Sequence, residues 1–187
     1  QTQLVAAENE GNVDADFHFL RAKAYTGTGQ FEQALADIEK AIEKDPKFVE
    51  AIGHKAVILL NSGRSKQALA AASKALEISK EGDVYYTRGA VYTALGKYEK
   101  ALEDLDAAVV LDSERADFFI ARGEVKVRMK RFDRAMRDFE RAIELDPDDP
   151  RPYLGRGGLY LLTGKKAAAK REFDRCIEMD PEFAVAY

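Results

Sequence analysis

The chain has 187 residues, of which 46% are hydrophobic and 33% are charged, and its formal net charge is −4. This composition is typical of a folded protein, and a single cysteine, Cys176, cannot close an internal disulfide. A mildly acidic chain repels polyphosphate, so nucleic acid is not expected as a partner. Apolar runs such as residues 56–60 are far shorter than the roughly 20 residues of a membrane helix, so membrane insertion is not expected.

One segment recurs along the chain. It reads ALADIEKAIEKDP at residues 34–46, AMRDFERAIELDP at 135–147 and AKREFDRCIEMDP at 169–181, and related segments begin at Ala68 and Ala101. The first alanines of the five segments are separated by 34, 33, 34 and 34 residues. A repeat of this length indicates one supersecondary unit per repeat, and such units must stack because a short helix pair cannot bury its apolar stripes alone.

In chain order, we expect residues 1–14 to be a partial preceding repeat or a cap helix. Five helix–turn–helix units follow at residues 15–48, 49–81, 82–115, 116–149 and 150–183, and residues 184–187 begin a further helix. The turns carry Gly29, Gly63, Gly96, Lys130 and Gly164. Glycine suits the left-handed residue that ends a helix, so we expect slight strain at Lys130.

This pattern resembles the tetratricopeptide repeat family, in which small residues recur at fixed places of both helices. The small place of the first helix holds Ala22, Ala56, Gly89, Gly123 and Gly157, and that of the second helix holds Ala34, Ala68, Ala101, Ala135 and Ala169. The resemblance covers residues 15–183, with departures from the family pattern that include His18, Lys126 and Ala72. It implies an all-α, right-handed α-solenoid of stacked antiparallel helix pairs, with about five repeats plus partial units at both ends.

A basic residue precedes the small place of every first helix, at Arg21, Lys55, Arg88, Arg122 and Arg156. The second helix carries an acid at Asp37, Asp104, Asp138 and Glu172, whereas the unit with Lys55 has Ala71 there. The series is either a row of ligand-binding arginines or an arginine–acid brace inside each helix pair. We favour the brace, because the acid is missing from the one unit that lacks the arginine.

The resemblance places the first helices along a concave wall, where we expect a partner segment to bind. It implies apolar inward residues at Phe19, Tyr86, Ile120 and Leu154, deeper charges at Lys23 and Glu124, and acids near the helix starts at Glu50, Asp83 and Asp117. The acids have an alternative role toward the helix dipole. His54 and Thr87 complete the expected binding face. They occupy places where some family members hold a C-terminal carboxylate, and neither matches that clamp. The expected partner is a protein or peptide with apolar anchors and basic residues.

The fourth unit also carries a basic cluster that includes Lys126, Arg128, Lys130 and Arg131. It is a candidate anion-binding patch. Acids such as Asp133 are interleaved with these cations, so an ordinary solvated turn is the favoured interpretation.

Catalysis has little support in the sequence, because His18 and His54 are the only histidines and no His/Cys set has metal-ligand spacing. We expect a non-catalytic scaffold without cofactor or metal. Two alternatives remain: a self-assembling structural scaffold, hence a homo-oligomer, and a non-catalytic targeting domain of a larger protein. The compartment is not determined; the single cysteine favours the cytoplasm and is compatible with the periplasm.

Overall fold

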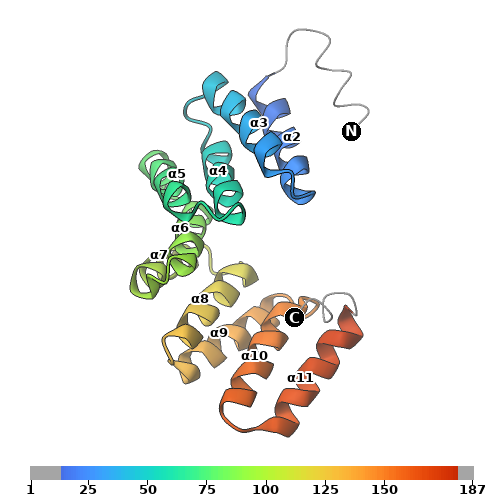
Figure 1. Ribbon diagram of the computed structural model, residues 1–187. Helices are drawn as coiled ribbons and strands as arrows, with labels where there is room; N and C mark the ends of the chain where they lie inside the picture. The colour runs from blue at the N-terminus through green and yellow to red at the C-terminus, as the bar shows by residue number, and fades with distance from the viewer. Residues whose placement is uncertain (1–13, 181–187) are drawn as a thin grey trace. The chain divides into compact units, whose positions relative to one another are not determined.

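The computed structural model describes residues 14–180, and within that range the protein forms ten α-helices and no strand (Figure 1). The helices alternate between a first or A helix and a second or B helix. The A helices are α2 (Ala15–Gly27), α4 (Val49–Asn61), α6 (Gly82–Ala94), α8 (Ala116–Arg128) and α10 (Pro150–Leu162). The B helices are α3 (Phe31–Lys44), α5 (Ser65–Ile78), α7 (Tyr98–Leu111), α9 (Phe132–Leu145) and α11 (Lys166–Met179). This arrangement confirms the predicted all-α fold of helix pairs.

The expected partial units at the two ends, residues 1–14 and 184–187, lie outside the described residues except for Asp14. Asp14 caps α2, because its carboxylate accepts a hydrogen bond of 2.9 Å from the backbone N–H of Phe17. Such a side chain satisfies one of the backbone donors that a helix start leaves without an intrahelical partner.

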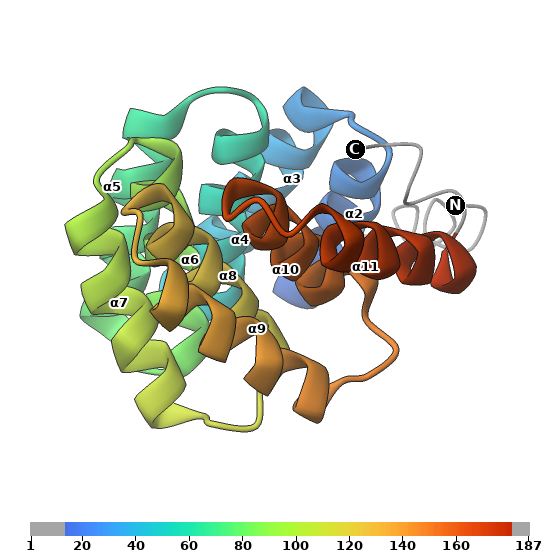
Figure 2. The same cartoon turned by 90° about the horizontal axis from the view of Figure 1, so that it is seen from below.

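The described helices form two compact units, of which the first ends at Gly96 and the second begins at Lys97. In unit 1, α4 packs against α2, α3, α5 and α6; in unit 2, α8 packs against α7, α9 and α10, and α10 packs against α11 (Figures 1 and 2). The division falls between α6 and α7, which are the two helices of the third expected repeat. It therefore does not coincide with a predicted repeat boundary, and those boundaries stay a prediction.

Fully buried small residues hold each helix pair together. In unit 1, Ala22 of α2 and Ala34 and Ala41 of α3 have no exposed surface, and neither do Ala56 of α4 and Ala68 of α5. A methyl group at these places lets the two backbones approach closely, and close packing at native density leaves no room for a larger side chain. The small-residue pattern of the sequence is therefore a packing requirement of the pair.

In unit 2, one aromatic ring is wedged between two A helices. Phe139 of α9 is only 1% exposed. A methyl group added at Gly123 of α8 would lie 2.8 Å from its Cε1 atom, and one added at Gly155 of α10 would lie 2.6 Å from its Cζ atom. These two glycines therefore form a slot that accepts the ring, and the ring fixes the distance between α8 and α10.

The turns inside the helix pairs share one backbone conformation. The φ angles of Gly29, Gly63, Gly96 and Gly164 lie between 68° and 77°, and Lys130 at the equivalent place has a φ of 58°. The N–H of Arg131 closes the turn on the carbonyl of Lys126 at 2.8 Å, as that of Gln30 does on Tyr25 at 2.9 Å. A residue with a Cβ is disfavoured there by about 1–2 kcal/mol, which agrees with the strain expected at Lys130.

We predict that Gly155→Ala destabilises the protein by about 1–3 kcal/mol, because the new methyl group overlaps the enclosed ring of Phe139. Gly158→Ala on the same helix is the matched control, since no atom lies within 4 Å of its added methyl group. That control should be neutral or stabilising by up to about 1 kcal/mol through helix propensity. Urea unfolding followed by circular dichroism measures both, and equal destabilisation by the two substitutions would contradict this packing.

Candidate functional site

Three arginines of the series form ion pairs within the protein. Arg21 donates to both carboxylate oxygens of Asp37, Arg122 donates to both oxygens of Asp138 at 3.1 and 2.7 Å, and Arg156 donates to Glu172 at 2.8 Å. Each of these pairs joins the A and B helices of one repeat across 16 residues. The predicted brace is therefore confirmed in three repeats, and these arginines are not available as a row of ligand-binding residues.

The braces are largely buried, and their charges support one another. Burial opposes ionisation of Asp37, but Arg21 and the nearby His18 hold the pKa of that carboxyl below its ordinary value. His18 itself is buried, with its Nδ1 atom 3.4 Å from Asp37. Burial likewise opposes the charged form of Arg122, yet Asp138 and Asp106 raise its pKa above the ordinary value.

The fourth repeat adds a second cation to its brace. The Lys126 Nζ atom lies 2.6 Å from Asp138, and the lysine side chain is only 11% exposed. Lys126 was named as a candidate member of an anion patch, but its charge is paired with Asp138 inside the protein, which leaves it little capacity to bind an anion. Arg128, Lys130 and Arg131 are not part of this brace, and anion binding by these three stays a prediction.

We predict that Asp138→Ala costs about 3–5 kcal/mol of stability, because it leaves Arg122 and Lys126 without their shared carboxylate. A double-mutant cycle on Arg122 and Asp138 should give a coupling energy of about 1–3 kcal/mol. The exposed pair Lys170–Asp174, at 2.6 Å on one face of α11, is the control and should give no more than about 0.5 kcal/mol. Zero coupling between Arg122 and Asp138 in urea unfolding would remove the brace as a stabilising feature.

A group of aromatic and polar side chains occupies the neighbouring A helices α2 and α4 of unit 1. The ring of Phe19 lies 5.0 Å from that of Phe48 and 5.9 Å, edge to face, from that of His54. The Lys23 Nζ atom lies 5.5 Å from the centre of the Phe19 ring. We call Phe19, Lys23, Thr26, Phe48 and His54 the α2–α4 cluster. It brings together three residues that were predicted to contact a partner, Phe19, Lys23 and His54.

Thr26 positions the imidazole of the α2–α4 cluster. The Thr26 hydroxyl donates to the carbonyl of Ala22 at 2.8 Å, and its oxygen lies 3.0 Å from His54 Nε2. Since the hydroxyl proton is already used, the Thr26 oxygen accepts from Nε2–H, and the other ring nitrogen of the neutral histidine carries the lone pair. Burial lowers the pKa of His54 from its ordinary value, and the charge of Lys23 lowers it further.

We predict that the free energy of unfolding falls as the pH decreases through 6.5, the ordinary pKa of histidine, because the unfolded chain protonates His54 before the folded chain does. Above about pH 7 this contribution is absent. Lys23→Ala should raise the pKa of His54 without restoring the ordinary value, since burial is the larger cause, and Lys40→Ala on α3 is the control. Titration of the imidazole ring protons by NMR, assigned with His54→Gln, measures this; a wild-type pKa at or above 6.5 would refute it.

The other predicted residues of unit 1 lie near the starts of the A helices. Glu50 of α4 and Asp83 of α6 are exposed, and Tyr86 and Thr87 of α6 are half-buried. The Thr87 hydroxyl donates to the backbone carbonyl of Asp83 at 2.8 Å, so it is engaged within its own helix. These residues offer charge and aromatic surface on α4 and α6, and their role toward a partner stays a prediction.

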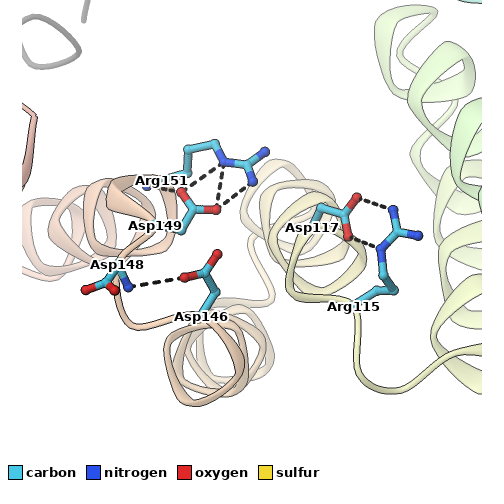
Figure 3. A network of polar contacts seen from close by, with 6 residues as sticks. All are labelled: Arg115, Asp117, Asp146, Asp148, Asp149 and Arg151. Atoms are coloured by element: carbon cyan, nitrogen blue, oxygen red, sulfur yellow. Dashed lines mark hydrogen bonds and ion pairs between the residues drawn. The ribbon is translucent and has the colours of Figure 1, made fainter.

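In unit 2, several predicted binding residues are occupied by contacts within the protein. Arg115 donates to both carboxylate oxygens of Asp117 at 3.1 and 2.8 Å, so this acid is already neutralised at the start of α8 (Figure 3). Ile120 is only 4% exposed and presents almost no surface to a partner. Leu154 is half-buried. The predicted use of Ile120 as a surface anchor is therefore not supported.

The start of α10 differs from the other A helices in carrying a cation, Arg151, in place of an acid. Arg151 pairs with the helix-capping Asp149 at 2.6 Å, while Asp146 accepts from the backbone N–H of Asp148 (Figure 3). Glu124 of α8 is exposed, yet its crowding by protein atoms raises the pKa of its carboxyl, and Arg151 and Arg128 oppose this rise. The acids near the starts of the first four A helices are thus followed by a paired cation in the fifth repeat.

Sequence reasoning missed Thr26, Phe48 and Arg115. Thr26 lies seven residues after Phe19 on the same helix, and this two-turn spacing could have placed it on the same face. Arg115 stands two residues before Asp117, and this spacing could have suggested their pairing. Phe48 lies outside the helices, at the N-terminal cap of α4. Helical periodicity applies only within a helix, so no sequence pattern predicted the contact of Phe48 with Phe19.

Among residues 14–180, no group of three or more His, Cys, Asp or Glu side chains could hold a metal ion. No helix in this range is long and apolar enough to cross a membrane. Cys176 is buried, and its thiol lies 3.3 Å from the backbone carbonyl of Pro150. Burial raises the pKa of that thiol, which disfavours the nucleophilic thiolate.

Sequence models described as tetratricopeptide repeat match residues 1–110, 86–150 and 126–187. The first match alone spans more than half of the chain. The chain belongs to the tetratricopeptide repeat family. The suspected resemblance is thereby confirmed, together with the fold that it implies for the helix pairs.

Curated relatives match this chain over part of their length. The chain is 34% identical over 90 residues to a STIP1 homolog from Dictyostelium discoideum, and 29% identical over 103 residues to DnaJ homolog subfamily C member 3 from Bos taurus. These matches cover 48% and 54% of this chain but only 16% and 20% of the two relatives. The chain therefore spans a small part of the proteins it resembles.

Solved tetratricopeptide repeat structures share the fold. A thermophilic TPR protein from Thermus thermophilus, TTC0263, has a TM-score of 0.82 at 22% identity, with 89% of this chain and 92% of that chain covered. PilF from Pseudomonas aeruginosa has a TM-score of 0.79 at 26% identity, with 88% and 76% covered. YrrB, described as a TPR protein with an unusual peptide-binding site, has a TM-score of 0.64 at 24% identity, with 98% and 96% covered. Tetratricopeptide repeat proteins are generally protein-interaction scaffolds and are typically non-catalytic.

Proposed function

We propose that this chain is a protein-interaction scaffold that binds a segment of a partner protein on the A helices of unit 1. The observation that carries the proposal is the α2–α4 cluster, in which a half-buried aromatic ring, an exposed ammonium group and an imidazole lie together on two neighbouring A helices. An aromatic anchor beside a few polar groups is the usual composition of an energetically important contact in a protein interface.

Charge on the same helices supports the expected type of partner. Asp16 and Glu50 are exposed in the first turns of α2 and α4. Exposed carboxylates there attract a basic side chain, while Phe19 offers a flat surface to an apolar one. A peptide with an apolar residue and a lysine or arginine nearby therefore matches this surface.

The comparison between the two units favours unit 1. The brace of the first repeat directs Arg21 toward α3, so the exposed charges on the A helices are a separate set. In unit 2, the corresponding positions hold the buried Ile120, the neutralised Asp117 and the paired Arg151. Fewer side chains of unit 2 are thus left to make new contacts with a partner.

Selection of a random peptide library against the protein tests the proposal. We expect enriched peptides to combine an apolar anchor with lysine or arginine. In fluorescence anisotropy, their Kd should rise about tenfold or more for Phe19→Ala and several-fold for Glu50→Lys, whereas Lys40→Glu on α3 should leave it unchanged. Circular dichroism checks that each variant is folded.

Equal affinity of the selected peptides for wild type, Phe19→Ala and Glu50→Lys would overturn the proposed surface. Light scattering over a range of concentrations adds an independent measurement. A mass that rises with concentration in wild type and stays constant in Phe19→Ala would show that the same surface binds a second copy of the chain instead.

A further inference from the structure

The B helix α5 departs from the other B helices at three neighbouring positions. Ala71 stands where the other repeats have a brace acid, Asp37, Asp104, Asp138 or Glu172. Ala72 stands where they have the bulky residues Ile38, Leu105, Phe139 or Phe173, and Ser73 stands where they have Glu39, Asp106, Glu140 or Asp174. In α5, side-chain volume and negative charge are therefore missing at the same place.

An open hollow of about 500 Å³ is lined by Ala71 and by other residues of α3, α4 and α5. We call it the α3–α5 hollow. Its apolar floor includes Leu35, Ile52 and Leu59, and its rim carries Lys55, Arg64 and Lys74. The volume is within the range of cavities that bind ligands and is enough for several side chains of a peptide. All of these residues belong to unit 1, and α4 packs against both B helices (Figure 1).

The hollow is lined by three cations, Lys55, Arg64 and Lys74, and by one acid, Glu39. Lys55 cannot pair within its own repeat and instead contacts Glu39 of α3 at 2.7 Å, a carboxylate that is 61% exposed. Arg64 contacts the exposed Glu32 at 2.5 Å. Within residues 14–180, Lys74 has no carboxylate at ion-pair distance, and α5 contains no acid before Glu77. The rim is thus positive, and its existing ion pairs are open to solvent.

We propose that the α3–α5 hollow is a second protein-binding site, which takes a partner segment that pairs an aliphatic side chain with an adjacent carboxylate. The aliphatic group fills the space over Leu35, Ile52 and Leu59. The carboxylate lies between Lys55 and Lys74, where it supplies from outside the acid that α5 lacks at Ala71. Charge complementarity selects this partner over the basic segment expected on the A helices. The site is separate from the α2–α4 cluster and does not depend on it.

An NMR titration tests the site with a defined probe, a peptide of alternating leucine and glutamate added to ¹⁵N-labelled protein. We expect amide shifts to concentrate at Ala70, Ala71 and Lys74 of α5 and at Leu35 and Glu39 of α3. The same peptide with glutamine in place of glutamate should bind at least about tenfold more weakly, because the contact with the ammonium groups is lost.

Substitutions in α5 separate charge from shape. Ala71→Asp restores the acid of the other repeats, so it should keep the protein folded and raise the Kd of the glutamate peptide about tenfold or more. Ala71→Asn has nearly the same volume without the charge and should raise the Kd by less than about threefold. Lys74→Glu should weaken binding as Ala71→Asp does.

Unchanged affinity of Ala71→Asp and Lys74→Glu for the glutamate peptide would overturn the proposal. Shifts confined to the α2–α4 cluster would also overturn it, as would equal binding of the glutamine peptide. None of these results bears on the A-helix surface, because that surface is tested with Phe19→Ala and Glu50→Lys and with basic peptides.

Discussion

The close approach of two helices at fully buried small residues is the constraint on which the rest of the structure depends. Because Ala22 meets α3 and Ala34 meets α2 without exposed surface, the two backbones are held at a short distance and in one register. That register brings a side chain of the A helix opposite one that lies 16 residues later on the B helix. The arginine–acid brace is a consequence of this spacing, because a long arginine side chain on the A helix reaches a short carboxylate side chain on the B helix.

The brace also determines which residues are left for binding. A buried or half-buried arginine that donates to both oxygens of a carboxylate has little capacity for another ligand, so it no longer contributes to recognition. The recognition that we propose therefore uses side chains outside the brace, such as Phe19 and Lys23 on the A helices, and places where the brace is incomplete. The second repeat has such a place, because Lys55 and Ala71 leave the inner pair unformed.

The sequence predicted those properties that follow from the repeat period. Thirty-four-residue spacing placed the helices, the glycine turns and the brace, and even the left-handed Lys130 could be expected from its position. The period does not predict the contacts of residues whose surroundings are not periodic. Lys126 was placed in an exposed cluster, but Asp138 of the same repeat accepts from it. Ile120 shares its position with the half-buried Phe19 and Tyr86 and yet is buried. The repeat period predicts where a residue lies in the unit, whereas its neighbours determine whether it is exposed and whether its charge is paired.

The departures from the period are for this reason the most informative positions in the chain. A substitution that only had to preserve packing would keep volume and charge at the second repeat, as Asp104 and Leu105 do in the third. In α5 both are absent, and a cation-rimmed hollow with an apolar floor lies beside Ala71. On α2 and α4, by contrast, aromatic side chains and exposed acids occupy the surface of helices whose small packing residues follow the repeat. The two surfaces that we propose on unit 1 therefore have opposite charge preferences, and together they would let one compact unit hold two different partner segments.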